Sequence, residues 1–279
     1  MPESDACADL VRRQDPDRFF ADLFAPAAAR PHLFALHAFN IEVGRIRETV
    51  SQPLPGEIRL QWWRDVALGL RPGEAAGHPV AAALTATIAQ FGLPLSAFDN
   101  LLEARIFDLY DDPMPSLNDL EGYAGETSSA LFQLAAMVLA DGGDPGTADA
   151  AGHAGVAYAL AGLMRALPFH ARRGQLYLPA DLLDRHGVAR DRLFAGETTP
   201  ALRAAIAELC GVARGHLGAA RVALRTAPAA VKPAFLPLAL VEPMLARLEA
   251  PGHDPLNTLA ELPQWRRQWR LWRAARTGI

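Results

Sequence analysis

The sequence predicts an all-α fold built as a single domain over residues 1–279. Hydrophobic residues make up 51% of the chain, which is ample for a packed core. Alanine is abundant, and Ala, Leu and Arg are all strong helix formers. No segment alternates apolar and polar residues as a half-buried strand would. There is also no internal repeat or low-complexity linker, so one domain is the simplest architecture.

In the first half of the chain, Pro and Gly residues mark where the expected helices begin and end. Asp15 precedes Pro16, which is typical of a helix N-cap followed by an acidic first turn. Pro31 opens the next helix, over residues 33–50, and the Pro-rich segment 51–56 is predicted to break it. Further helices are expected over residues 58–70, 79–91 and 95–110, the last of them stopped by Pro113.

In the second half, Ser116 or Asn118 is expected to cap a short turn before a helix over residues 123–140. The next helix covers 147–167 and ends or kinks at Pro168, which lacks an N–H group. Residues 182–185 form a short helix and residues 200–225 a long one. Residues 229–247 contain three prolines and are expected to form kinked pieces, and the final helix covers 263–276.

Charge and cysteine content restrict the function classes. The net charge of −4 gives no bulk basic field, so no nucleic-acid partner is expected. Cys7 and Cys210 lack metal-ligand spacing, which favours a reducing, cytoplasmic compartment. The first five residues lack the apolar core of a secretory signal. No uninterrupted apolar run approaches the roughly 20 residues of a membrane span.

Several short segments carry a more specific signal. Residues 172–179 read RRGQLYLP, residues 61–64 read QWWR and residues 35–40 read ALHAFN. These segments resemble signatures of the squalene/phytoene synthase family, and the resemblance extends over roughly residues 19–183. The opening S-F-Y of that family appears here as Arg18-Phe19-Phe20. The resemblance implies a helical bundle around a central cavity, where magnesium ions held by carboxylates bind prenyl diphosphates.

The carboxylates of both magnesium motifs are nearly all missing. The first motif, D-D-x-x-D, falls on residues 44–48, where only Glu48 keeps a carboxylate and Arg45 has the opposite charge. The second falls on residues 162–170, where Arg165 matches the family and His170 replaces the last aspartate. No acidic residue lies between Asp149 and Asp181. No metal site is therefore expected, and magnesium is implied only if the chain is an active enzyme.

Cations alone could bind a phosphate, because the guanidinium fork matches phosphate oxygens. The candidate anion-binding residues are Arg45, Arg165, His170, Arg172 and Arg173. The alternatives are structural. Arg45 and Arg47 would pair with Glu42 and Glu48. Arg172 and Arg173 would lie in a solvated turn, and Arg165 would pair with a distant acid.

Asp108 and Asp112 have the i, i+4 spacing of a metal site. However, Asp112 precedes Pro113 and is expected to lie in a loop.

The final helix has its own pattern. Trp265, Trp269 and Trp272 fall on one helical face, and arginines occupy the rest. This composition is typical of a helix at a membrane interface, and it also suits a protein-binding face. The alternative is that the Trp stripe packs on the domain and the arginines are solvated.

Fold markers without metal ligands resemble a branch of the family that assists the assembly of respiratory complex I. This resemblance implies a non-catalytic protein, peripheral on the inner membrane, that contacts complex I subunits or assembly intermediates. An isoprenoid or lipid tail in the old cavity is a further implied ligand. One alternative is an active head-to-head prenyl transferase acting on prenyl diphosphates, and another is an isoprenoid-binding module without either role.

Overall fold

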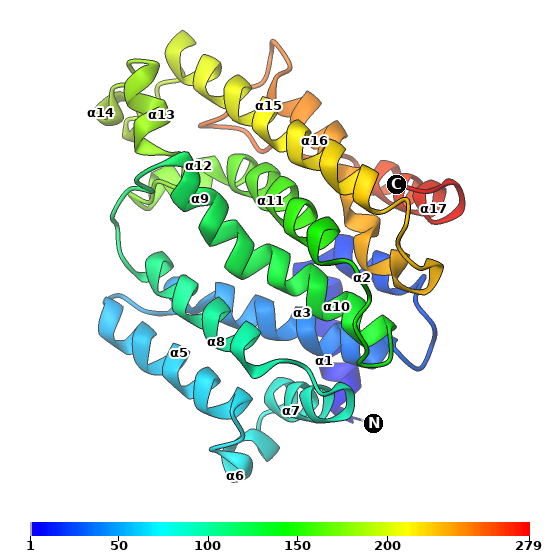
Figure 1. Ribbon diagram of the computed structural model, residues 1–279. Coiled ribbons are helices and arrows are strands. Elements are labelled where there is room, and N and C mark those ends of the chain that lie inside the picture. Colours follow the sequence, from blue (N-terminus) through cyan, green and yellow to red (C-terminus); the bar gives the residue numbers. More distant parts are fainter. Residues whose placement is uncertain (1) are drawn as a thin grey trace.

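A computed structural model describes residues 2–279, with side chains from Asp5 onward, and every regular element among them is a helix. The prediction of an all-α fold is therefore confirmed. Figure 1 shows α11 (Ala148–Arg165) inside the bundle, with α15 (Pro200–Ala223) packed alongside it. One large cluster of buried apolar side chains extends through the bundle, from Cys7 to Ala260.

The chain begins with a helix that the sequence analysis did not predict, α1 (Pro2–Gln14). It packs against α3 (Arg30–Gly44) and α7 (Pro79–Phe91). The predicted cap at Asp15 is confirmed, because its carboxylate accepts from the N–H of Arg18 at the start of α2 (Pro16–Asp22).

The single helix predicted over residues 33–50 is interrupted. The ψ angle of Arg45 opens to −1°, which ends α3 and starts the one-turn helix α4 (Ile46–Thr49). The break predicted over 51–56 is shorter than expected, since α5 (Pro53–Ala67) starts inside it. Pro53 fits the first turn because the N–H groups there need no partner within the helix.

Shorter helices follow. They are α6 (Pro72–Ala76), α8 (Leu95–Ala104) and a 3₁₀ turn, η1 (Arg105–Leu109). The helix predicted over 123–140 begins earlier, at Leu117, and is capped by the Ser116 hydroxyl, which accepts from the N–H of Asp119. It consists of α9 (Leu117–Ala124), a π-helical turn η2 (Gly125–Ser129) and α10 (Ala130–Leu139).

The end of α11 confirms the predicted effect of Pro168. The helix stops at Arg165, and Pro168 lies in the first turn of α12 (Leu167–Arg172). The short helices α13 (Ala180–Arg185) and α14 (Arg190–Phe194) follow near the start of α15.

The apolar stretch after α15 forms two pieces, as its prolines predicted: η3 (Ala229–Leu240) and α16 (Val241–Leu248). Together they are long and apolar enough to cross a membrane, which the sequence analysis did not expect, but 56% of the relevant window is buried within the fold. The last helix is α17 (Gln264–Thr277). It lies near one end of α15, and α13 and α14 lie near the other end (Figure 1).

Candidate functional site

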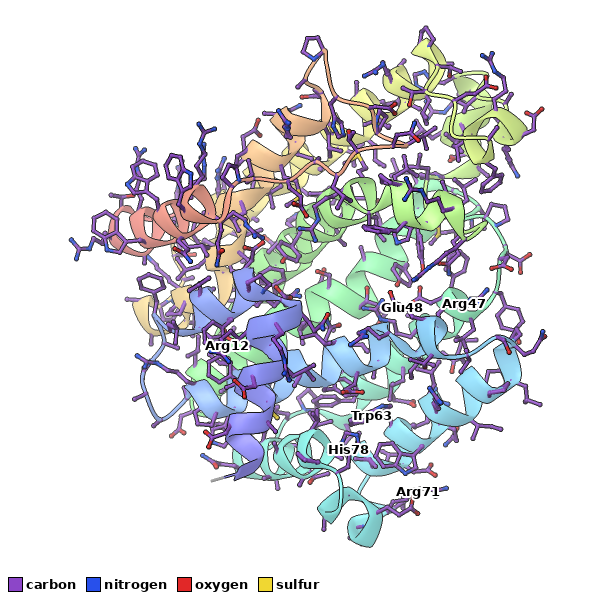
Figure 2. The ribbon with its side chains drawn as sticks, turned by 180° about the vertical axis from the view of Figure 1, so that it is seen from behind. Arg12, Arg47, Glu48, Trp63, Arg71 and His78 are labelled. Carbon is purple, nitrogen blue, oxygen red and sulfur yellow. The ribbon has the colours of Figure 1, made fainter. Side chains whose placement is uncertain are left out.

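The first degenerate motif forms an ion-pair cluster around one carboxylate. Glu48 lies on α4, beside Arg47 (Figure 2). Its two carboxylate oxygens are 3.6 Å from Nε of Arg45 and 3.2 Å from Nη1 of Arg173. Arg47 pairs instead with Asp111, at 3.0 Å, so the predicted alternative for this residue was wrong about its partner.

The second motif is divided by the turn after α11. Arg165 ends α11, and its charge acts on the buried groups Asp17 and Tyr158. Arg173 follows α12 and reaches Glu48. Arg172 is exposed and has no ion-pair partner in the described part of the chain. Of the five predicted anion-binding residues, the structure joins Arg45 and Arg173 through Glu48, and the break at Ala166 places Arg165 on a different helix from His170 and Arg172.

A buried hydrogen-bond network lies behind this cluster, and Asp108 is its centre. The Asp108 carboxylate accepts from the Tyr177 hydroxyl at 2.7 Å, from the Tyr123 hydroxyl at 2.8 Å and from Nη1 of Arg105 at 3.0 Å. Its backbone carbonyl accepts from the Gln175 side chain at 3.0 Å. Asp108 is thus fully engaged with protein donors.

The two phenols and the guanidinium of the network keep their charge states at neutral pH. Burial raises the pKa of Tyr123 and Tyr177, so both remain protonated donors. Burial alone would lower the pKa of Arg105, but Tyr123 and Asp108 outweigh it and the net shift is upward. The result is one buried carboxylate, one guanidinium and two neutral phenols, an arrangement that satisfies most of its own polar atoms.

His170 packs against this network, with its ring centroid 4.6 Å from that of Tyr177. Burial lowers the pKa of His170 to about 4, so the imidazole is neutral at pH 7. Its Nδ1 atom is buried without a hydrogen-bond partner. His170 therefore adds no positive charge to the predicted anion site.

A second buried cation was missed by the sequence analysis. Arg18, which stands where the family has a serine, is only 7% exposed. Its guanidinium donates to Asp15 at 2.9 Å and lies 4.7 Å from the ring centroid of Tyr158. The replacement of the family's serine by Arg18 was the one signal in the sequence that this position is unusual. Nothing in the sequence showed that the arginine would be buried.

The residues present do not fit a magnesium centre. Mg²⁺ requires oxygen ligands in near-octahedral geometry, usually with carboxylates. The first motif offers Glu48 alone, already paired with two guanidinium groups. Asp112 lies in an exposed loop, as predicted, whereas Asp108 is buried. Within residues 2–279, no three His, Cys, Asp or Glu side chains are grouped so that they could share a metal ion.

The tryptophans of α17 face outward. Trp265, Trp269 and Trp272 are 64%, 51% and 44% exposed, so the alternative that they pack on the domain was wrong. The helix is held by its other face, where Leu271 and Ala274 are buried against η3 and α2. Each tryptophan carries an arginine over its ring: Arg266, Arg273 and Arg276, with guanidinium carbons 5.1, 5.6 and 4.2 Å from the ring centroids.

The architecture belongs to the class of all-α prenyl synthase folds. It superposes on a squalene synthase from Alicyclobacillus acidocaldarius with a TM-score of 0.76 at 22% identity, covering 91% of this chain and 95% of that one. It also superposes on a dehydrosqualene synthase crystallised with a ligand, with a TM-score of 0.78 at 18% identity, covering 98% and 95%.

Sequence comparison defines the family. The squalene/phytoene synthase profile matches residues 11–273, and the chain belongs to this family. It is similar to complex I assembly factor 6 of Homo sapiens, with 28% identity over 271 residues, which cover 95% of this chain and 81% of the human protein. It is also similar to the phytoene synthase of Thermus thermophilus, with 28% identity over 280 residues, which cover 95% and 90%.

Proposed function

We propose that this chain assists the assembly of respiratory complex I and does not catalyse prenyl transfer. The observation that carries the proposal is the pairing of Glu48 with Arg45 and Arg173. Glu48 is the one carboxylate in the two segments that match the magnesium motifs. The similarity to complex I assembly factor 6 along nearly the whole chain supports the assembly role. The partners would be complex I subunits or assembly intermediates.

Prenyl transfer depends on stabilising the leaving group. Ionising a prenyl diphosphate places negative charge on pyrophosphate, which must be met by preorganised cations or metal ions. Arg45 and Arg173 already share Glu48, and neutral His170 supplies no charge at pH 7. Because the described part of the chain groups no set of carboxylates that could hold magnesium, the main means of stabilising that charge is missing there.

The experiment has a genetic and a biochemical part. Deleting the gene should lower assembled complex I on native gels, and the wild-type chain should restore it. The purified chain, incubated with farnesyl or geranylgeranyl diphosphate and Mg²⁺, should give no condensation product. The Thermus thermophilus phytoene synthase, assayed in parallel, is the positive control. Normal complex I in the deletion strain would contradict the assembly role.

The second candidate is an active prenyl transferase. It is favoured by the similarity to the Thermus thermophilus phytoene synthase, which is as high in percentage identity as that to the human assembly factor. Product formation that a chelator abolishes would establish this candidate. A prenyl tail that co-purifies with the chain without turnover would instead support the proposal that the bundle holds an isoprenoid or lipid.

Peripheral contact with the inner membrane is the remaining part of the proposal. It is supported by the exposed Trp265, Trp269 and Trp272 with their stacked arginines. Tryptophan rings favour the headgroup level of a bilayer, and arginines favour anionic lipid. We expect the variant in which Ala replaces all three tryptophans to remain folded and to lose its membrane association.

A further inference from the structure

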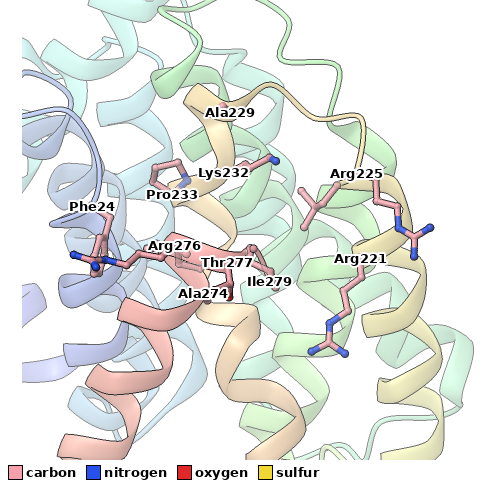
Figure 3. Close-up of a pocket in the computed structure, with 14 residues that line it drawn as sticks. Phe24, Arg221, Arg225, Ala229, Lys232, Pro233, Ala274, Arg276, Thr277 and Ile279 are labelled. Atoms are coloured by element: carbon pink, nitrogen blue, oxygen red, sulfur yellow. The ribbon is translucent and has the colours of Figure 1, made fainter.

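A groove of about 630 Å³ opens where the end of α15, η3 and the end of α17 meet (Figure 3). Its volume is within the range of small-molecule sites. Apolar side chains line part of it, among them Phe24, Leu224, Pro233 and Leu236. Four basic side chains also line it: Arg221, Arg225, Lys232 and Arg276.

The groove cations have no acidic partners. Neither Arg221, Arg225 nor Lys232 forms an ion pair within the part of the chain that the structure describes, and no Asp or Glu side chain lines the groove. The opposite holds elsewhere on α15, the helix of Arg221, since Arg214 is paired with both Glu242 and Glu249. In a chain of net charge −4, this is a local excess of positive charge, which attracts anions.

The groove is continuous with the exposed tryptophan face. Arg221 also lines a smaller neighbouring pocket that includes Trp269 and Arg273 of α17. Arg276 borders the groove while its guanidinium lies over Trp272. Beside Arg221, Val222 is 60% exposed. Unpaired cations, exposed apolar side chains and interfacial tryptophans thus share one face of the molecule.

We propose that this groove binds the phosphate headgroup of an anionic phospholipid in a bilayer. The guanidinium groups of Arg221 and Arg225 and the ammonium of Lys232 would meet the phosphate oxygens. The apolar floor at Leu224 and Leu236 would contact the glycerol and upper acyl region. This combination suits a lipid in a bilayer, because the cations, the apolar side chains and the exposed tryptophans border one groove, as they do in elements that lie at a membrane surface. The inference does not rest on the assembly role.

The test is co-sedimentation of the full chain with phosphatidylcholine vesicles, with and without phosphatidylglycerol. The variant is Arg221→Gln/Arg225→Gln/Lys232→Gln. The matched control, Arg185→Gln/Arg190→Gln/Arg192→Gln, removes the same charge from α13 and α14 near the other end of α15. Since each basic residue near an anionic surface contributes roughly fivefold, the groove variant should bind the anionic vesicles about a hundredfold more weakly, and the control close to wild type.

Further measurements separate loss of binding from loss of folding and from a change in net charge. Circular dichroism and thermal melting show whether the variants fold, and an Arg221→Lys/Arg225→Lys variant should retain binding if charge is what matters. Equal weakening in the groove variant and the control would overturn the proposal, because net charge alone would explain it. The proposal would also fail if the groove variant bound vesicles normally but lost binding to inorganic phosphate or to an acidic peptide.

Discussion

Nη1 of Arg173 lies 3.2 Å from Oε1 of Glu48, joining two residues that are 125 positions apart in the sequence. Glu48 belongs to the first degenerate motif, and Arg173 follows the second. Where the family resemblance implies metal ions between carboxylates, this chain has a guanidinium against a single carboxylate. The pair connects α4 to the residue that follows α12.

The first prediction is that divalent metal leaves stability unchanged. A ligand that binds only the folded state stabilises it, by about 2.7 kcal/mol at a hundred times its dissociation constant. With Glu48 paired to Arg45 and Arg173, we expect neither Mg²⁺ nor a chelator to shift the melting temperature. Differential scanning fluorimetry checks this, and a Mg²⁺-dependent rise would contradict it.

The second prediction concerns the buried network. Asp108→Asn leaves the buried Arg105 without its counter-ion, and removing one partner of a buried pair typically costs about 3–5 kcal/mol. We expect a loss of that size in the free energy of unfolding measured with urea. The control is Asp112→Asn in the nearby exposed loop, where we expect a change within about 0.5 kcal/mol. Similar effects for the two variants would show that the network is not structural.

The third prediction is that the folded chain loses stability at acidic pH because His170 takes up a proton on unfolding. Its pKa is about 4 in the folded chain and 6.5 in the unfolded reference, so the unfolded state binds the proton first as pH falls. The stability contributed by the neutral imidazole is therefore complete above pH 6.5. It is lost progressively between pH 6.5 and 4, by up to about 3 kcal/mol.

Urea unfolding of the wild type and of His170→Asn across this range measures the effect. The variant should lose less stability on acidification than the wild type. His32 and His253, whose pKa values burial also lowers, are present in both proteins and cancel in the comparison. Parallel pH profiles would show that His170 does not carry the effect.

The fourth prediction separates the two faces of α17. Leu271 is fully buried, whereas Trp269 is half exposed. Leu271→Ala should destabilise the chain by about 2–5 kcal/mol, as large-to-small core substitutions do. Trp269→Ala should change the free energy of unfolding much less, despite the larger side chain. If the order were reversed, the tryptophan face rather than Leu271 would anchor the helix.

The fifth prediction tests the close approach of α11 to η2. A Cβ atom at Gly155 would lie 2.2 Å from the backbone nitrogen of Ser129, so Gly155→Ala requires a shift of the backbone. We expect it to cost about 1–3 kcal/mol. Gly162 on the same helix has nothing within 4 Å of the added Cβ, and Gly162→Ala should stabilise by about 0.5–1 kcal/mol. Thermal and urea unfolding of both variants decides the comparison.

Local signals accounted for most of the helices. The caps at Asp15 and Ser116 and the break before Pro168 are set by the nearest few residues, and the structure confirms them. The interruption at Arg45 and the early start at Pro53 were missed. The helical periodicity of the sequence continues through both places, and the local propensities do not decide between one helix and two.

By itself, the sequence determined the fold class and the family signatures, because these depend on residue identity and on local backbone preference. Only the tertiary structure decided that Glu48 meets Arg173, that Asp108 is buried among hydroxyl and guanidinium donors, and that Arg221 borders a groove without acidic side chains. Pairing and burial depend on how helices distant in sequence pack together. An arginine can be a solvated charge, a buried counter-ion or part of a binding surface, and the helix that packs against it decides which.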